Sequence, residues 1–251
     1  MRIVTHNAKF HTDDVFSVAA LLILYPEAEV VRTREEDLIK LADIVVDVGQ
    51  VYDAKSNRFD HHQVGGAGQR ANGIQYASFG LVWQKFGEEV SGSPEVAEKI
   101  DRTMAQLVDA ADNGQDVISS TIPELFPFTI NGIVDQYRPT WKEVENWDER
   151  FMEAVHWAQA VIKREIKIAA DVLEGAKVIE QLYRVSAGKK IFVFGGKSKL
   201  WKITEFFQFG NLAAICAVFF DNISSGIIQL TCFASIVKKR KIRRFKKSFI
   251  V

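Results

Sequence analysis

Histidine and aspartate residues gather in four short segments of this sequence. Four of the five histidines lie in two of these segments, and one aspartate stands alone among apolar residues. Imidazole and carboxylate groups in combination are typical ligands of divalent metal ions. The segments are Thr5–Asp14 (THNAKFHTDD), Asp47, Phe59–Gln63 (FDHHQ) and Asp109–Gly114 (DAADNG).

Each segment also has an ordinary structural explanation. A histidine after a strand can simply be a polar residue with its hydrogen bonds made, and Asp13 could be a carboxylate favoured by the dipole at a helix N-terminus. Asp47 is harder to explain, because an ionised carboxylate in a buried strand is costly unless it is paired or binds a cation. Asp109 and Asp112 sit unfavourably in the last turn of a predicted helix.

The residue types indicate which metal and which chemistry to expect. Mixed histidine and aspartate, with no cysteine in residues 1–196, favour Mn²⁺ or Mg²⁺, with Zn²⁺ or Co²⁺ as alternatives. Two histidines and four or more aspartates exceed what one tetrahedral site needs. We therefore expect two ions ~3.5–4 Å apart, bridged by one carboxylate, an arrangement suited to hydrolysis of a phosphate ester or anhydride.

Strands and helices must bring these segments together. Short apolar segments predict strands, and amphipathic spacing with capping residues predicts helices. Their alternation predicts an α/β fold with a parallel sheet covered on both faces, whose carboxyl strand ends meet at one edge. The expected strands are 3–5, 29–32 and 44–48; the expected helices are 13–25, 33–41, 76–86, 93–111 and 147–187, the last as one helix or two joined near Gly175.

Local signals refine this picture. Thr33 and Glu36 have the spacing of a capping box, and Ser93 followed by Pro94 has the pattern of an N-cap with proline in the first turn. Residues 65–73 (GGAGQRANG) have the composition of a mobile loop.

The adjacent Asp60, His61 and His62 resemble the signature of the DHH phosphoesterase superfamily, which includes manganese pyrophosphatases and single-strand exonucleases. The wider ordered set, in register from residue 2 to about residue 190, is similar to the Myg family (UPF0160 type) of metal-dependent hydrolases, whose eukaryotic members are 3′→5′ RNA exonucleases. The motifs are His6-Asn7-x-x-Phe10-His11-x-Asp13-Asp14, Val46-Asp47-Val48-Gly49, Tyr52-Asp53, Arg58-Phe59-Asp60-His61-His62-Gln63, Tyr76-Ala77-Ser78-Phe79-Gly80-Leu81-Val82-Trp83 and Asp109-Ala-Ala-Asp112-Asn113-Gly114.

The resemblance implies which residues bind metal. Asp47 would be the carboxylate that bridges two ions, and in the fourth segment Asp112 is preferred over Asp109. The spacing of the first segment differs from the commoner His-x-x-x-Asp-x-Asp pattern, so the division between His11, Asp13 and Asp14 stays open. The implied ligands are His6, His11, Asp13, Asp47, His61 and Asp112.

The resemblance also implies residues that act on substrate. His62 is too close to His61 to share its orientation, so it would face the substrate phosphate as a hydrogen-bond donor or general acid, and it joins Asp47 as an expected catalytic residue. Arg70 in the glycine-rich segment is a candidate phosphate clamp, with a solvated loop arginine as the alternative. Gln63 is a further candidate for substrate binding.

Two departures from the family pattern fall inside the motifs. Ala8 and Gln50 stand where the family usually has glycine. Neither change removes a ligand, but each would strain a turn if the backbone there requires a positive φ.

Composition places the chain among ordinary globular proteins. Its 251 residues include 47% hydrophobic and 25% charged residues, which excludes disorder, collagen-like repeats and a disulfide scaffold for the whole chain. Only two cysteines and a strand directly at the start predict a reducing, cytoplasmic location without a targeting peptide.

The formal net charge of zero is a sum over two unlike parts. From Lys197 onward there are 11 basic and 2 acidic residues, which leaves 21 basic and 30 acidic residues in 1–196. This apolar and basic C-terminal part lacks the later motifs of the family. It could be a basic arm for RNA; a membrane anchor is disfavoured because Asp221, Asn222 and Gln229 interrupt the apolar run. The preferred hypothesis is a reading-frame change near residue 198.

The expected organisation has three parts. Residues 1–145 would form a DHH-like metal-binding catalytic domain, 146–190 a long connecting helix or helices, and 191–251 an atypical, incomplete second domain. The expected function is a 3′→5′ exonuclease that uses Mn²⁺ or Mg²⁺, in two ions, on single-stranded RNA or a short oligonucleotide. The alternatives are a small-molecule phosphatase or pyrophosphatase, or a metal-binding but inactive family member. The expected assembly is a homodimer, with no membrane partner.

Overall fold

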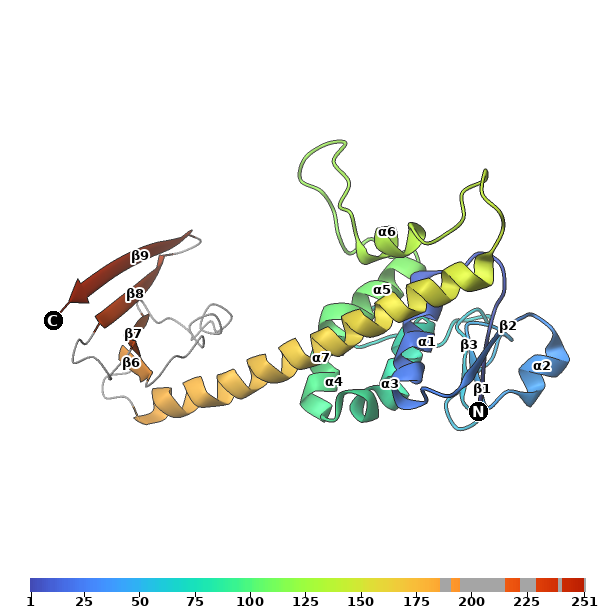
Figure 1. The fold of residues 1–251 in the computed structure, drawn as a ribbon, viewed down its shortest axis with the longest axis horizontal. Helices are drawn as coiled ribbons and strands as arrows, with labels where there is room; N and C mark the ends of the chain where they lie inside the picture. The colour runs from blue at the N-terminus through green and yellow to red at the C-terminus, as the bar shows by residue number, and fades with distance from the viewer. Residues whose placement is uncertain (186–190, 195–214, 222–228, 239–240, 251) are drawn as a thin grey trace. The chain divides into compact units, whose positions relative to one another are not determined.

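The computed structural model of the chain describes residues 1–185, 191–194, 215–221, 229–238 and 241–250 (Figure 1). The chain divides into two compact units, residues 1–169 and 170–251. All four histidine and aspartate segments lie in the first unit. The domain boundaries expected from the sequence stay predictions.

A five-stranded sheet forms one layer of the first unit. Its strands stand in the order β2-β1-β3-β5-β4. β1, β2, β3 and β5 run parallel to their neighbours, and β4 pairs antiparallel with β5 at the edge. The sequence prediction of an α/β fold with a largely parallel sheet is confirmed. The strands are β1 (Arg2–Thr5), β2 (Glu29–Arg32), β3 (Ile44–Val46), β4 (Tyr52–Asp53) and β5 (Arg58–Phe59).

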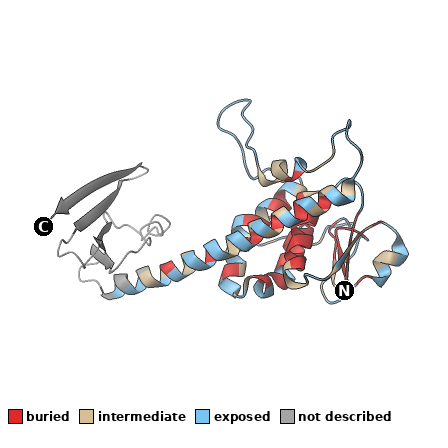
Figure 2. Cartoon of the chain, in the orientation of Figure 1, coloured by how far each residue is buried: buried red, intermediate tan, exposed pale blue. Residues whose placement is uncertain are grey.

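Helices pack around this sheet and supply most of the core (Figure 2). Along α1, eleven residues from Thr12 to Leu22 are buried, and α1 packs closely against α3. On one face of the sheet, Val31, Val4 and Val45 stand in one row across three strands, and Ile39 of α2 packs against them. The helices are α1 (Thr12–Leu24), α2 (Glu36–Leu41), α3 (Ser78–Ser91), α4 (Pro94–Ile100), α5 (Gln106–Asp112), α6 (Ile130–Asp135) and α7 (Trp147–Val185).

The capping box expected at Thr33 is not formed. The α2 helix begins only at Glu36, because Glu35 has an extended backbone and is the N-cap residue. The Thr33 hydroxyl oxygen accepts a hydrogen bond from the Glu35 amide at 3.1 Å. Thr33 therefore closes a local turn before the helix and does not cap it.

The helix expected over residues 93–111 is interrupted. Ser93 is the N-cap, as predicted, and its hydroxyl accepts a hydrogen bond from the Val96 amide. A π-helical turn, Asp101–Ala105 (η1), then separates α4 from α5. Such a turn changes which residues of the following helix face the neighbouring helices α1 and α3, so it affects the direction in which the side chains of α5 point.

The α7 helix is a single helix of 39 residues that continues through Gly175. Its buried hydrophobic residues lie in the part that belongs to the first unit and recur at helical spacing (Figure 2). They are Phe151, Ala154, Val155, Ala158, Ile162 and Ala169.

The second unit contains a four-stranded sheet of order β6-β7-β8-β9. The apolar runs of the C-terminal part form strands β6 (Ile191–Phe194), β7 (Ile215–Asp221) and β8 (Gln229–Lys238), and most of the basic run forms β9 (Lys241–Ile250). Within the described ranges, no helix is long and apolar enough to cross a membrane. Residue 198, where a frame change was expected, lies outside the described residues. The basic-arm, incomplete-domain and cytoplasmic expectations stay predictions.

Candidate metal centre

The carboxyl ends of three parallel strands meet at one edge of the first sheet. His6 follows β1, Asp47 follows β3, and His61 follows β5 by one residue. The N-terminus of α1 brings Asp13 to the same place, and α5 brings Asp112. The sequence prediction that these segments converge at the strand ends is therefore confirmed.

Asp47 lies just after β3, not inside the strand as expected from its apolar neighbours. The strand ends at Val46 because Asp47 has a φ of 55°, a left-handed conformation that a strand does not allow. Its side chain is nonetheless buried. The turn aims the carboxylate at the edge of the sheet where the histidines lie.

The two oxygens of Asp47 face two different histidines. Oδ2 lies 3.2 Å from Nε2 of His6, and Oδ1 lies 3.5 Å from Nε2 of His61. His6 Nε2 also lies 3.1 Å from Oδ2 of Asp14. His61 Nε2 lies 3.1 Å from Oδ2 of Asp112 and 3.7 Å from Oδ2 of Asp13. Asp47 thus stands between two groups of ligands.

Three sets of side chains have atoms close enough to share a cation. Two sets contain Asp47, and a third joins His11 and Asp13 from α1 to the α5 carboxylate. The rings of His6 and His11 lie 5.7 Å apart. The sets are His6, His11 and Asp47; Asp47, His61 and His62; and His11, Asp13 and Asp112.

Unsatisfied buried atoms fit a metal centre. Oδ1 of Asp13, Oδ2 of Asp14, Oδ2 of Asp47 and Nε2 of His61 are buried and make no hydrogen bond of suitable geometry. Leaving such groups unpaired is costly, whereas a divalent cation would satisfy all of them. The donor set of imidazole nitrogen and carboxylate oxygen suits such an ion.

The helix N-termini orient the carboxylates. Oδ1 of Asp14 accepts hydrogen bonds from the amides of His11 (2.9 Å) and Val15 (2.7 Å). Oδ2 of Asp13 accepts one from the amide of Ser78, the first residue of α3, at 3.3 Å. Sequence reasoning left open whether Asp14 is a ligand and gave Ser78 no role. The adjacent Asp13-Asp14 pair at a helix start was the available signal for Asp14.

Burial and charge shift the histidine pKa values strongly. Burial lowers the pKa of His6, but the carboxylates of Asp14 and Asp47 outweigh it and raise this pKa to about 10. Burial likewise lowers the pKa of His61, and Asp112 and Asp47 raise it to about 10. Both imidazoles are therefore cations at neutral pH when the carboxylates are the only charges near them.

The carboxylates respond to the same environment. Burial raises the pKa of Asp47, but His6 and His61 outweigh burial and hold this pKa below its ordinary value. Burial and then the charge of Asp47 raise the pKa of Asp13 well above its ordinary value. The concentration of negative charge around Asp13 is the electrostatic condition that a bound cation would relieve.

His61 and His62 both lie near Oδ1 of Asp47, but their side chains differ in exposure. The side chain of His61 is 7% exposed, whereas that of His62 is 53% exposed. Nδ1 of His62 lies 2.8 Å from Oδ1 of Asp60, whose Oδ2 accepts the Gln50 amide at 2.6 Å. Burial raises the pKa of Asp60, but the hydrogen bonds from His62 and from the Gln50 amide outweigh burial and lower this pKa below its ordinary value. The catalytic role of His62 stays a prediction.

Asp109 and Asp112 occupy different positions on α5. Asp112 faces His61, and its preference over Asp109 as a metal ligand stays a prediction. Asp109 is fully buried and instead accepts hydrogen bonds from the amide of Gly80 (2.8 Å) and from Arg70 (2.7 Å). Burial raises the pKa of Asp109 to about 7, although Arg70 opposes this shift.

Arg70 is not a solvated loop arginine, because its side chain is 7% exposed. Its guanidinium is bound to Asp101 and Asp109, each at 2.7 Å, and lies 4.1 Å from the centre of the Tyr76 ring. To bind a phosphate, Arg70 would have to release the carboxylates of Asp101 and Asp109. That role stays a prediction.

The glycine-rich segment is not the loosely attached loop that its composition indicated. Gln69 and Gln75 form a β-bridge, and the Arg70 amide donates to the Ile74 carbonyl. Gln115, beyond α5, accepts the Gln75 amide at 2.8 Å and donates to the Gly73 carbonyl at 3.1 Å. We call residues 69–75 the docked hairpin. Composition missed it because its bonds are to residues far along the chain.

Gln63 lies before this hairpin. Its amide nitrogen donates to the Gly66 carbonyl at 3.0 Å, and its Oε1 is buried without a hydrogen bond. No contact in the described part of the chain tests its expected role in substrate binding.

The cluster opens into a cleft of about 870 Å³. His6, His11, Asp47 and His62 line one part of it. The wall of the cleft around α2 and β5 carries basic side chains, because Arg34, Lys40 and Arg58 line it together with Glu36. The size falls within the range of ligand-binding sites.

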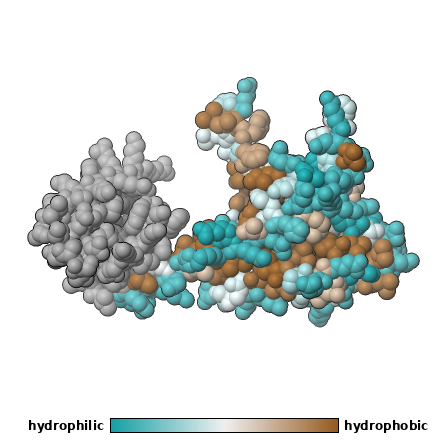
Figure 3. All heavy atoms as spheres, viewed as in Figure 1, coloured by the Kyte–Doolittle hydropathy of each residue, from teal (hydrophilic) through white to brown (hydrophobic). Residues whose placement is uncertain are grey.

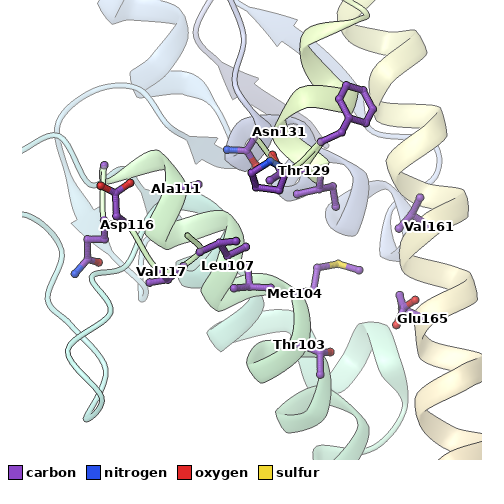
Figure 4. Close-up of a pocket in the computed structure, with 16 residues that line it drawn as sticks. Thr103, Met104, Leu107, Ala111, Asp116, Val117, Thr129, Asn131, Val161 and Glu165 are labelled. Carbon is purple, nitrogen blue, oxygen red and sulfur yellow. The ribbon is translucent and has the colours of Figure 1, made fainter. Parts of the chain in front are cut away.

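A second cavity of about 660 Å³ shares no lining residue with this cleft. Met104 of η1, Leu107 of α5 and Val161 of α7 line it (Figure 4). Exposed hydrophobic residues of the neighbouring loop, among them Phe126 and Phe128, add to the apolar surface shown in Figure 3. None of the expected site residues lies there.

The sequence of the chain is also similar to those of known proteins. Residues 2–213 match the model of a family described as an uncharacterised protein family, UPF0160. The chain is 33% identical over 163 residues to the MYG1 exonuclease of Bos taurus, which covers 57% of this chain and 43% of that protein. It is 27% identical over 223 residues to MYG1 protein C27H6.8 of Caenorhabditis elegans, a match that covers 79% of this chain and 66% of that protein. It is 30% identical over 155 residues to a MYG1 protein of Chlamydia pneumoniae, covering 61% and 50%.

The chain spans less than half the length of the bovine relative and about two thirds of the nematode one. No solved structure matches the chain. The resemblance to the DHH superfamily therefore stays a prediction. The family match continues past residue 198, where the sequence suggested a change of reading frame, and that hypothesis also stays a prediction.

Proposed function

Because this chain belongs to the MYG1 family, UPF0160, we propose that it is a divalent-metal-dependent hydrolase that cleaves phosphodiester bonds. The proposed reaction is 3′→5′ exonucleolytic cleavage of RNA or short oligonucleotides. Support for a nuclease comes from relatives that carry the name MYG1 exonuclease.

The position of Asp47 carries the proposal. It presents one oxygen to His6 and the other to His61, and it belongs to two of the three ligand sets. A carboxylate between two groups of ligands is the arrangement that binds a pair of ions. We propose Mn²⁺ or Mg²⁺, one held by His6, His11 and Asp47 and the other by Asp13, Asp47, His61 and Asp112.

Bound divalent ions would supply positive charge at the phosphoryl group and activate water for attack. The remaining tasks belong to side chains of this chain. His62 is the proposed proton donor to the leaving oxygen. Because Asp60 holds its Nδ1, the other ring nitrogen is left for the substrate, and Asp60 also favours the protonated ring. Burial opposes that effect, yet the net pKa of His62 is raised, with Asp60 as the first cause.

The cleft supports an anionic substrate. Arg34 is exposed, and among the described residues no carboxylate lies within ion-pair distance of it. Within the described ranges Lys40 forms an ion pair with Glu36 alone, an exposed contact of little energetic value. A phosphate chain that leaves the metal centre along this wall would meet Arg34 and Lys40.

The test is hydrolysis of a 5′-labelled oligoribonucleotide by the full chain. With Mn²⁺ we expect stepwise shortening from the 3′ end, with none in EDTA. Asp47→Asn should reduce cleavage to background, whereas Asp37→Asn, which removes an exposed carboxylate of α2, should not. Pyrophosphate and a small phosphomonoester are assayed beside the oligonucleotide. Hydrolysis of these alone would favour a small-molecule phosphatase, and full activity of Asp47→Asn would refute the bridging role.

A further inference from the structure

Arg70 joins three parts of the first unit. It belongs to the docked hairpin, and its guanidinium binds Asp101 in the π-helical turn and Asp109 in α5. Gln106 reinforces the contact, because its side chain donates to Asp101 and accepts from Asn72 of the hairpin, at 2.7 and 2.8 Å. The hairpin is thereby attached to the N-terminal half of α5.

Asp109 connects this network to the centre. It lies three residues before Asp112 on the same helix, so the two carboxylates are neighbours one turn apart. Asp109 faces Arg70 and the Gly80 amide, whereas Asp112 faces His61. Fixing Asp109 therefore fixes the rotation of α5 that presents Asp112 to the centre.

Gly80 shows how closely the parts fit. A Cβ atom at this position would stand 1.8 Å from Oδ2 of Asp109 and 2.6 Å from a guanidinium nitrogen of Arg70. Only glycine lets α3 approach α5 while the ion pair is in place. α3 also carries Ser78, whose amide and hydroxyl bind Asp13 and Asp47.

We propose that Arg70 and Asp109 are positioning residues for the metal centre. They hold α5 so that Asp112 completes the group around His61, and they make metal binding at that group depend on the docked hairpin. The proposal rests on the proposed binding of divalent ions. It replaces a phosphate clamp by a role in which Arg70 does not touch the substrate.

Arginine suits this task for a physical reason. Its planar guanidinium binds Asp101 and Asp109 at once, which the single ammonium group of lysine does not reproduce. Removing the arginine altogether would leave the buried Asp109 carboxylate unpaired, with a large loss of stability. Arg70→Lys is therefore the variant to measure, because it keeps the positive charge.

The experiment is calorimetric titration of the full, metal-free chain with Mn²⁺. Outer residues that orient metal ligands typically contribute about 10- to 100-fold to metal affinity, and we expect a loss of that size in Arg70→Lys. In a chain that also carries His61→Ala, Arg70→Lys should cause no further loss of affinity, because the group of ligands around His61 is already broken. In a chain that carries His6→Ala, Arg70→Lys should still lower the Mn²⁺ affinity by the full amount. Arg150→Lys, which alters another partly buried arginine that binds a carboxylate, is the matched control.

Gly80→Ala provides a second route to the same state, because its Cβ atom would displace Asp109 and crowd the Arg70 guanidinium while the hairpin sequence stays unchanged. It should weaken Mn²⁺ binding with the same dependence on His61. Melting curves of each variant establish that it is folded. A chain in which Arg70→Lys binds Mn²⁺ normally but has a higher KM for an oligonucleotide would restore the phosphate clamp and overturn the proposal. Equal losses in the His6→Ala and His61→Ala backgrounds would also overturn it.

The outcome is separate from that of the proposed reaction. A wild-type chain that binds Mn²⁺ but hydrolyses no phosphodiester would refute the proposed function, and the titrations would still decide the role of Arg70. A wild-type chain that binds no Mn²⁺ would refute both.

Discussion

The hydroxyl group of Ser78 donates a hydrogen bond to Oδ1 of Asp47 at 3.0 Å, and both side chains are buried. The amide of the same residue lies 3.3 Å from Oδ2 of Asp13. One residue at the start of α3 therefore orients two carboxylates that come from a strand end and from α1. Hydrogen bonds of this kind fix the direction in which a carboxylate presents its free oxygen to a metal.

Ser78→Ala should weaken Mn²⁺ binding by about tenfold, because Asp47 loses the donor that orients it. Titration of the full chain measures this. Ser17→Ala is the matched control, since Ser17 is a fully buried serine of α1 whose hydroxyl makes no hydrogen bond. An unchanged affinity in Ser78→Ala would show that the carboxylate does not need this contact.

Metal binding should release protons. His6 and His61 have pKa values raised to about 10, so both hold a proton at pH 7 in the metal-free chain and must lose it to bind an ion. We expect at least two protons released, and an affinity that rises about 100-fold per pH unit between pH 6 and 8. Calorimetry in buffers of different ionisation enthalpy counts the protons. His6→Gln should release one fewer, and His156→Gln on α7 the same number as wild type.

The same shifts set the pH dependence of metal-free stability. A histidine pKa raised from 6.5 to about 10 means that the folded chain binds the proton more tightly than the unfolded chain. This contribution is complete below pH 6.5 and is lost as the pH rises towards 10. Denaturant unfolding in EDTA should therefore show stability that falls across this range. A flat profile would contradict the charge pairing of the two histidines.

Ala8→Gly and Gln50→Gly should each stabilise the chain by about 1 kcal/mol. Ala8 has a φ of 63° and Gln50 a φ of 56°, and an L-residue with a side chain is strained in this region. Denaturant unfolding gives the free-energy difference. Ala170→Gly, in an exposed position of α7, should have the opposite sign, about 1 kcal/mol less stable. A loss of stability at both positions would mean that local contacts outweigh the backbone strain.

Arg34→Ala combined with Lys40→Ala should raise the KM for an oligonucleotide by about tenfold, and each lost phosphate contact should lower the salt dependence of log KM by about 0.7. The KM for a small phosphodiester should rise far less. Lys163→Ala with Arg164→Ala removes the same charge from α7, away from the cleft. If that control weakens oligonucleotide binding equally, the cleft wall is not the path of the chain.

The place where the histidine and aspartate segments meet could be predicted because it depends on local sequence and one general rule. His6, Asp47 and His61 each follow an apolar segment, and the ends of parallel strands meet. The sequence predicted backbone strain at Ala8 and Gln50 if their φ angles were positive, and both φ angles are positive. The family and the α/β fold were likewise accessible from the sequence.

Features that depend on distant partners were not accessible. The docked hairpin overlaps residues 65–73, which have the composition of a mobile loop, and one of its attachments comes from Gln115, 40 residues beyond Gln75. The π-helical turn has no signal in a sequence that reads as a continuous helix from Ser93. The turn at Asp47 was hidden by the apolar residues on both sides of it.

The expected ligands are spread from residue 6 to residue 112, across three strand ends and two helices. The ion that we propose between Asp13, Asp47, His61 and Asp112 would be a cross-link that closes a loop of roughly 100 residues, and closing so long a loop removes much of the entropy of the unfolded chain. Chelation would then do more than remove catalytic charge. It would also open this loop, and resistance to proteolysis should fall together with activity.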